Sequence, residues 1–130
     1  MNSLKSFVYR LVPNAMIQAL RKRRWQRMFI NATESEPEQA VLNQFVKSGD
    51  HVIDIGANLG SYTKLLAVLV GPTGNVYSIE PAPFTFGVLK DNIQHARLDN
   101  VHLLHYAVSS DNREIVMQIP RFDTGGESYY

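Results

Sequence analysis

Apolar residues along the chain fall into short runs that predict strands. The run over residues 51–55 is almost wholly apolar, as expected for a strand covered by helices. Residues 76–79 and 101–108 predict two further strands, and residues 114–119 predict a fourth. The segment after it, residues 121–130, contains two adjacent glycines and is expected to be a loop.

The segments between these runs have apolar residues at helical spacing. It predicts helices over residues 61–70 and 84–96, together with an earlier helix that starts at Ser35-Glu-Pro-Glu38 and ends near Lys47. The resulting order β-α-β-α-β implies parallel strands joined by right-handed crossovers. We therefore expect an α/β fold of the Rossmann-like, doubly wound type, with residues 34–130 as one domain.

Charge separates the N-terminal 33 residues from this domain. Residues 1–30 hold seven basic and no acidic side chains, whereas residues 31–130 hold six basic and twelve acidic ones. Apolar residues at helical spacing precede the basic cluster, and Pro13 is expected to divide two short helical pieces. Two interpretations stay open for residues 5–27: a helix packed on the domain with its arginines in water, or a peripheral contact with an anionic membrane. A nucleic-acid partner is not expected.

The segment that connects the first strand to the next helix carries the main functional signal. A strand, a glycine turn and a helix in succession allow backbone N–H groups to approach a ligand closely. A dinucleotide site requires Gly-x-Gly-x-x-Gly, but here Asp54 replaces the first glycine, Gly56 follows, and Gly60 comes one residue late. A carboxylate at this place disfavours a pyrophosphate and suits a ligand with an ammonium group, such as S-adenosylmethionine.

A second carboxylate, Glu80, closes the strand over residues 76–79. It lies 20 positions after Gly60, where a βαβ nucleotide site places the acid that accepts the ribose hydroxyls. Its charge opposes a 2′-phosphate, which disfavours NADP. A glycine turn between two carboxylates at neighbouring strand ends therefore predicts a site for an adenosyl amino acid.

Several motifs of this chain, in order and spacing, resemble the FkbM family of class I methyltransferases. The resemblance covers residues 34–119 and rests on Glu36-Pro-Glu38, Val52-Ile-Asp-Ile-Gly-Ala-Asn-Leu-Gly-Ser-Tyr-Thr63, Val70-Gly-Pro-Thr-Gly-Asn-Val76, Ile79-Glu-Pro-Ala-Pro83, Leu89-Lys-Asp-Asn-Ile93, Asn100-Val101 and Tyr106-Ala-Val-Ser109. It implies a methyltransferase that uses S-adenosylmethionine to methylate an oxygen of a small molecule or a sugar.

The resemblance also implies a complete fold of seven strands in which the first strand is central. This chain would supply only the first half, so the strand over residues 51–55 should lie at a bare sheet edge. We expect a truncated chain, or one whose sheet a partner chain completes.

Nine residues form the predicted cofactor site. By resemblance, Asp54 and Gly56 face the methionine part and Glu80 the ribose, whereas Asn58 either contacts the cofactor or caps the next helix. No catalytic residue and no metal site are predicted, and the lack of cysteine fits a reducing cytoplasm. A non-catalytic partner subunit and an NAD-dependent oxidoreductase are the alternative functions. The full set is Asp54, Gly56, Asn58, Gly60, Ser61, Tyr62, Glu80, Pro81 and Ala107.

Overall fold

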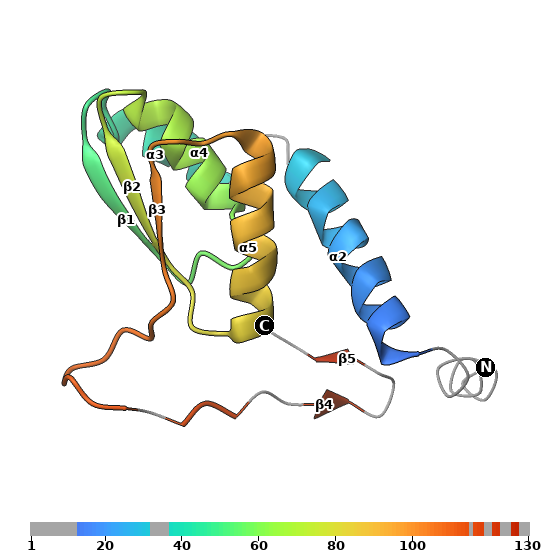
Figure 1. Cartoon of the computed structure of the whole chain (residues 1–130). Coiled ribbons are helices and arrows are strands. Elements are labelled where there is room, and N and C mark those ends of the chain that lie inside the picture. Colours follow the sequence, from blue (N-terminus) through green and yellow to red (C-terminus); the bar gives the residue numbers. More distant parts are fainter. Residues whose placement is uncertain (1–12, 32–36, 115, 119–120, 123–125, 128–130) are drawn as a thin grey trace.

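The computed structural model shows a small parallel sheet with helices on one side (Figure 1). It describes residues 13–31, 37–114, 116–118, 121–122 and 126–127. The elements are α2 (Asn14–Asn31), α3 (Pro37–Phe45), β1 (His51–Ile55), α4 (Ser61–Val70), β2 (Asn75–Ile79), α5 (Pro83–Ala96), β3 (Val101–Leu104), β4 (Arg121–Phe122) and β5 (Gly126–Glu127). The predicted β-α-β-α-β order is confirmed.

The main sheet has the order β1-β2-β3, with all three strands parallel. The register aligns Ile55 of β1 with Ile79 of β2 and Leu104 of β3, so the three carboxyl ends lie together. Because β2 is central, β1 is an edge strand of the described sheet, as predicted. The exposed side chains of Ile53 and Ile55, each 64% accessible, show that its outer face is uncovered in the described part of the chain.

Helices α4 and α5 cover the other face of the sheet (Figure 1). The apolar face of α4 packs Leu66 and Val70 against Val76 of β2, and both valines are fully buried. In α5 the buried residues Val88, Leu89 and Ile93 recur at helical spacing, which confirms the predicted apolar side of that helix. These two helices therefore fix the positions of the turns at the carboxyl ends of β1 and β2.

The basic N-terminal helix α2 packs against α5. Its Phe29 is only 2% exposed and joins Leu89 and Ile93 in the core. The side chain of Trp25 contacts the ring of Phe84 edge-on, with 5.4 Å between the ring centroids. The helix begins immediately after Pro13, as the division at that proline predicts, whereas the earlier helical piece lies outside the described residues.

Two strand predictions were wrong. The third strand ends at Leu104 rather than at residue 108, because β2 ends at Ile79 and Pro81 has no N–H with which to extend the ladder. The described residues between 114 and 118 contain no strand, because an extended segment forms a strand only when it pairs with a neighbour. Val116 in this segment is 95% exposed. The expected loop over 121–130 instead contains β4 and β5, which pair antiparallel.

Across the described residues, the helices are all too short or too polar to cross a membrane.

Gly60 is a glycine of the turn that the fold is expected to tolerate changing poorly. A Cβ at this position would lie 2.7 Å from Cδ1 of the fully buried Leu89, and the backbone φ of +94° is one that L residues avoid. We expect Gly60→Ala to lower the free energy of unfolding by about 2–4 kcal/mol through crowding and backbone strain. Urea denaturation measures this change.

The matched control is Gly87→Ala, within α5. A Cβ there meets no atom within 4 Å, so this substitution should raise the free energy of unfolding by about 0.5–1 kcal/mol. Equal stability of the Gly60→Ala variant and the unchanged chain would contradict the packing described for the turn.

Candidate cofactor site

The turn after β1 is bound directly to the end of β2. The backbone N–H groups of Gly56 and Ala57 both donate to the carbonyl of Ile79, at 2.9 and 3.0 Å. Gly60 then closes the turn by donating to the carbonyl of Ala57 at 2.8 Å, and α4 begins at the next residue. The glycine turn is therefore held against β2, beside the position of Glu80.

Glu80 connects the two turns at the carboxyl end of the sheet. Its Oε2 accepts a hydrogen bond from the N–H of Asn58 at 3.0 Å, and its Oε1 accepts one from the N–H of Ala82 at 2.9 Å. The side chain is only 7% exposed. A carboxylate oxygen can accept more than one hydrogen bond, so each oxygen retains acceptor capacity for a ligand.

Asp54 lies one residue before the end of β1 and faces α4. Its Oδ2 accepts a hydrogen bond of 2.6 Å from the hydroxyl of Thr63, which is itself 3.0 Å from the hydroxyl of Ser78. Burial raises the pKa of Asp54 above 3.8; the Thr63 hydrogen bond opposes that shift, and the nearby charge of Glu80 adds to it. A carboxylate with these surroundings is stabilised by any cation that binds beside it.

Three residues of the turn have left-handed backbone conformations. The φ angles of Gly56, Asn58 and Gly60 are +79°, +50° and +94°. A Cβ on Gly56 would meet no atom within 4 Å, so at this residue the backbone borders open space. The N-cap of α4 is Gly60, and no side chain caps the helix. The alternative that Asn58 caps α4 is therefore wrong.

The remaining predicted residues of the cofactor site lie on three different segments. Ser61 and Tyr62 form the first turn of α4 and are half-buried. Pro81 follows Glu80, and its carbonyl lies 3.1 Å from Nε2 of His105. Ala107 lies in the extended segment three residues beyond the end of β3, not on a strand as predicted, because β3 stops at Leu104.

Sequence reasoning missed three residues that support the turn from behind. Thr63 and Ser78 orient Asp54, and Asn92 of α5 donates from Nδ2 to the carbonyl of Leu59 at 2.8 Å. Thr63, Ser78 and Asn92 are all almost completely buried. Polar residues on the inner sides of α4, β2 and α5 were the available signal, because a buried polar group needs a partner.

Histidine, aspartate and glutamate side chains do not gather into a potential metal site within the described part of the chain. His102 instead stacks on Tyr77 across the strands, with 4.9 Å between ring centroids, and its Nε2 lies 2.7 Å from Oδ1 of Asn75. The acidic residues of the candidate site are thus Asp54 and Glu80.

This fold and this site define a Rossmann-like domain of the class I methyltransferase type. A family model described as the TRM5/TYW2 methyltransferase domain matches residues 26–123. The chain belongs to this family, and its cofactor is S-adenosylmethionine. The match supports the wider class and does not single out the FkbM family within it.

Sequence relatives and solved structures agree with that class. The chain is 34% identical over 59 residues to a protein-L-isoaspartate O-methyltransferase of Methanothrix thermoacetophila, covering 45% of this chain and 28% of the relative. The same enzyme of Methanocella arvoryzae is 32% identical over 74 residues, which cover 55% and 39% of the two chains. The chain thus spans about a third of the length of these relatives.

Among solved structures, a candidate rRNA methylase of Clostridium thermocellum is 28% identical and superposes with a TM-score of 0.52. The superposed region covers 54% of this chain and 38% of the methylase chain. A SAM-dependent O-methyltransferase of Thermotoga maritima has the same TM-score at 22% identity, with 63% and 34% covered. The second likeness shows the fold alone.

The raised pKa of Asp54 makes the stability of the fold depend on pH. Because the pKa is higher in the folded than in the unfolded chain, the folded state binds more protons, and stability falls as pH rises above 3.8. We expect Asp54→Asn to be more stable than the unchanged chain at pH 7, and this advantage to shrink as the pH falls toward 3.8. Urea denaturation across this pH range measures the difference.

Asp99→Asn, at an exposed position, is the control for removal of a carboxylate elsewhere. A stability difference for Asp54→Asn that is the same at every pH would contradict the assigned cause.

Proposed function

We propose that residues 34–130 form the S-adenosylmethionine-binding half of a methyltransferase, with residues 1–33 as a basic extension. The observation that carries this proposal is the pair of carboxylates, Asp54 and Glu80, joined through the glycine turn by the bond from Asn58 to Glu80. In the proposal, Asp54 binds the methionine ammonium directly or through a water molecule. The Gly56–Gly60 turn admits the methionine carboxylate, and Glu80 binds the ribose hydroxyls.

The electrostatics of the site support these roles. Asp54 and Glu80 repel each other enough to contribute to the raised pKa of Asp54. An ammonium group bound beside Asp54 would offset that repulsion and the cost of burying the carboxylate. Donors at the first turn of α4, which no side chain caps, suit the carboxylate that shares the α-carbon with this ammonium group.

For the methyl acceptor, we propose an oxygen atom of a small molecule or a sugar, as the FkbM resemblance implies. The two curated relatives are named as O-methyltransferases, which supports oxygen as the acceptor atom, although they are named for protein substrates. Transfer requires the acceptor oxygen to be aligned with the methyl group before chemistry occurs. Our proposal assigns no catalytic residue to the chain, and it includes a cytoplasmic location.

Removing either carboxylate charge is expected to weaken cofactor binding. A charge-assisted hydrogen bond contributes about 1.5–3 kcal/mol, so Asp54→Asn and Glu80→Gln should each raise the Kd for S-adenosylmethionine about 10- to 100-fold. Isothermal titration calorimetry of the 130-residue chain measures this, with NAD as the competing ligand and Asp99→Asn as the control.

Thermal unfolding must accompany the titrations, because Glu80 also accepts two backbone hydrogen bonds. Glu80→Ala should lower the free energy of unfolding by about 1–3 kcal/mol, because it leaves these N–H groups without their acceptor. If Asp54→Asn and Glu80→Gln both fold and both bind S-adenosylmethionine with unchanged affinity, the assignment of the cofactor site is overturned. Selective NAD binding would indicate an oxidoreductase, and no binding by a folded chain would indicate a non-catalytic subunit.

A further inference from the structure

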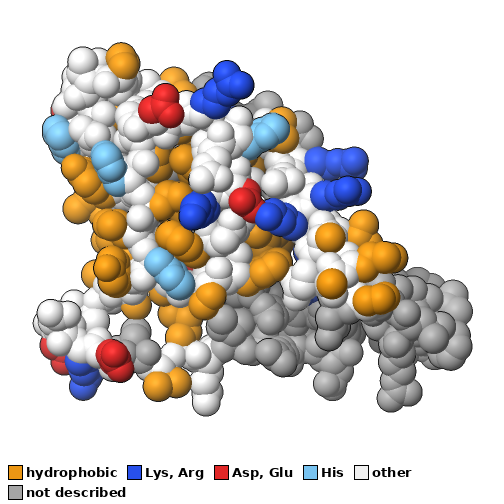
Figure 2. Space-filling model, in the orientation of Figure 1, with side chains coloured by type: hydrophobic (Ala, Val, Ile, Leu, Met, Phe, Trp, Pro, Cys, Tyr) orange, Lys and Arg blue, Asp and Glu red, His pale blue; other side chains and the backbone are white. Residues whose placement is uncertain are grey.

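The outward face of α2 combines arginines with apolar side chains. Five residues of α2, spaced alternately four and three positions apart, form one stripe along the helix, and all five are exposed. Arg24 and Met28 flank the stripe. Figure 2 shows Lys and Arg side chains gathered with hydrophobic ones over this helix. The stripe, which we call the α2 outer face, consists of Met16, Leu20, Arg23, Arg27 and Ile30.

The opposite side of α2 is fixed to the domain. Lys22 pairs with Asp91 of α5, Trp25 contacts Phe84, and Phe29 enters the core. These contacts set the rotation of the helix about its axis, so the α2 outer face points away from α5. The exposure of its apolar residues is therefore a consequence of how the helix is docked.

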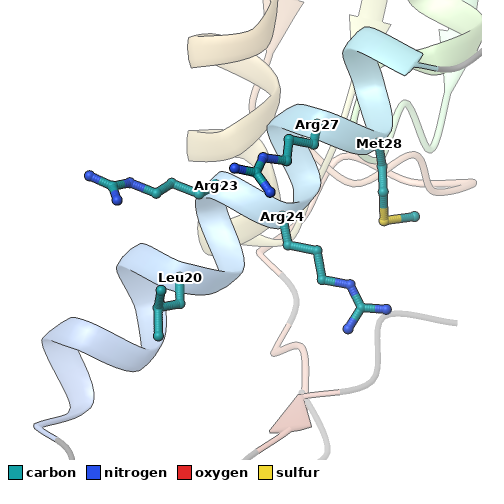
Figure 3. Close-up of a pocket in the computed structure, with 5 residues that line it drawn as sticks. All are labelled: Leu20, Arg23, Arg24, Arg27 and Met28. Atoms are coloured by element: carbon teal, nitrogen blue, oxygen red, sulfur yellow. The ribbon is translucent and has the colours of Figure 1, made fainter.

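The charge on α2 has one sign. The helix holds five basic residues and no acidic one. Figure 3 shows the guanidinium groups of Arg23, Arg24 and Arg27 reaching outward beside Leu20 and Met28. Within the described part of the chain, none of these three arginines forms an ion pair. Their charges are left for a partner with negative charge.

We infer that the α2 outer face binds the surface of a membrane containing anionic lipids. Such a surface attracts arginines through its head groups and accepts Met16, Leu20 and Ile30 at the boundary with the acyl chains. Arginine side chains can lie along that boundary with their charged ends at the head groups.

A nucleic acid would use only part of this face. Phosphates would bind the arginines but gain nothing from the exposed aliphatic side chains, and unpaired bases stack on aromatic rings. The single tryptophan of the chain, Trp25, is already packed against Phe84. The mixture of aliphatic and cationic side chains therefore favours the lipid surface.

The docking of α2 connects this surface to the candidate cofactor site. Cε2 of Phe29 lies 3.4 Å from the place that a Cβ on Gly60 would occupy, so the helix borders the glycine turn. A helix is about 10–12 Å in diameter, which is the scale of the separation between the bound lipid and that turn. The inference does not depend on the proposed function, because it concerns only the face of α2.

Co-sedimentation with vesicles tests the inference on the 130-residue chain. We expect binding to phosphatidylcholine vesicles that contain phosphatidylserine, little binding to phosphatidylcholine alone, and weaker binding as salt increases. The variant with Arg23→Gln, Arg24→Gln and Arg27→Gln should lose on the order of a hundredfold in partitioning at low salt. Circular dichroism checks that the variant is folded.

A charge-matched control removes three cations elsewhere, at exposed positions: Lys47→Gln, Arg97→Asn and Arg113→Gln. Asparagine is chosen at position 97 because φ there is +53°. The control should bind the anionic vesicles nearly as well as the unchanged chain. An equal loss in both triple variants would mean that only net charge matters and would overturn the inference.

A second variant, Met16→Gln with Leu20→Gln, separates lipid from nucleic acid. It should weaken vesicle binding and leave binding of a 20-nucleotide single-stranded RNA unchanged. The inference is overturned if the unchanged chain prefers this RNA to anionic vesicles at the same salt. It is overturned equally if this apolar variant binds the vesicles as well as the unchanged chain.

Discussion

The hydrogen bonds between the glycine turn and the end of β2 are the constraint on which the site depends. The N–H groups of Gly56 and Ala57 share the carbonyl of Ile79, and the next turn residue donates to Glu80. These contacts satisfy backbone donors that the turn would otherwise expose or bury unpaired. They also place both carboxylates on one edge of the sheet. The same bonds that stabilise the fold thus assemble the proposed cofactor site.

The two carboxylates of the site lower the stability of the folded chain, and the rest of the domain must offset that unfavourable free energy. Two carboxylates lie close together with limited access to water, and burial already raises the pKa of Asp54. The neutral hydrogen bond from Thr63 reduces this cost but does not remove it. A fold selected for stability alone would replace Asp54 with a neutral residue. In the proposed function, a positively charged group that binds beside Asp54 offsets this cost.

The sequence predicted the parts of the fold that local patterns determine. The glycine turn and the helix over residues 61–70 follow from short-range spacing, and the sheet edge follows from strand order. The end of β3 depends instead on where its neighbour stops pairing, so an apolar run could not predict it. Likewise Thr63, Ser78 and Asn92 support the site through contacts 9 to 33 residues apart in the chain. The polar character of these residues is visible in the sequence, but the spacing of a single sequence does not show which residues they contact.

The exposed face of β1 places a requirement on whatever covers it. Parallel sheets are stable when both faces are covered, yet helices cover one face in the described part of the chain, and Ile53 and Ile55 are largely exposed. The matched segments span 28% and 39% of the two curated relatives, so most of each relative lies outside the segment that matches this chain. Any cover must present an apolar surface to these isoleucines.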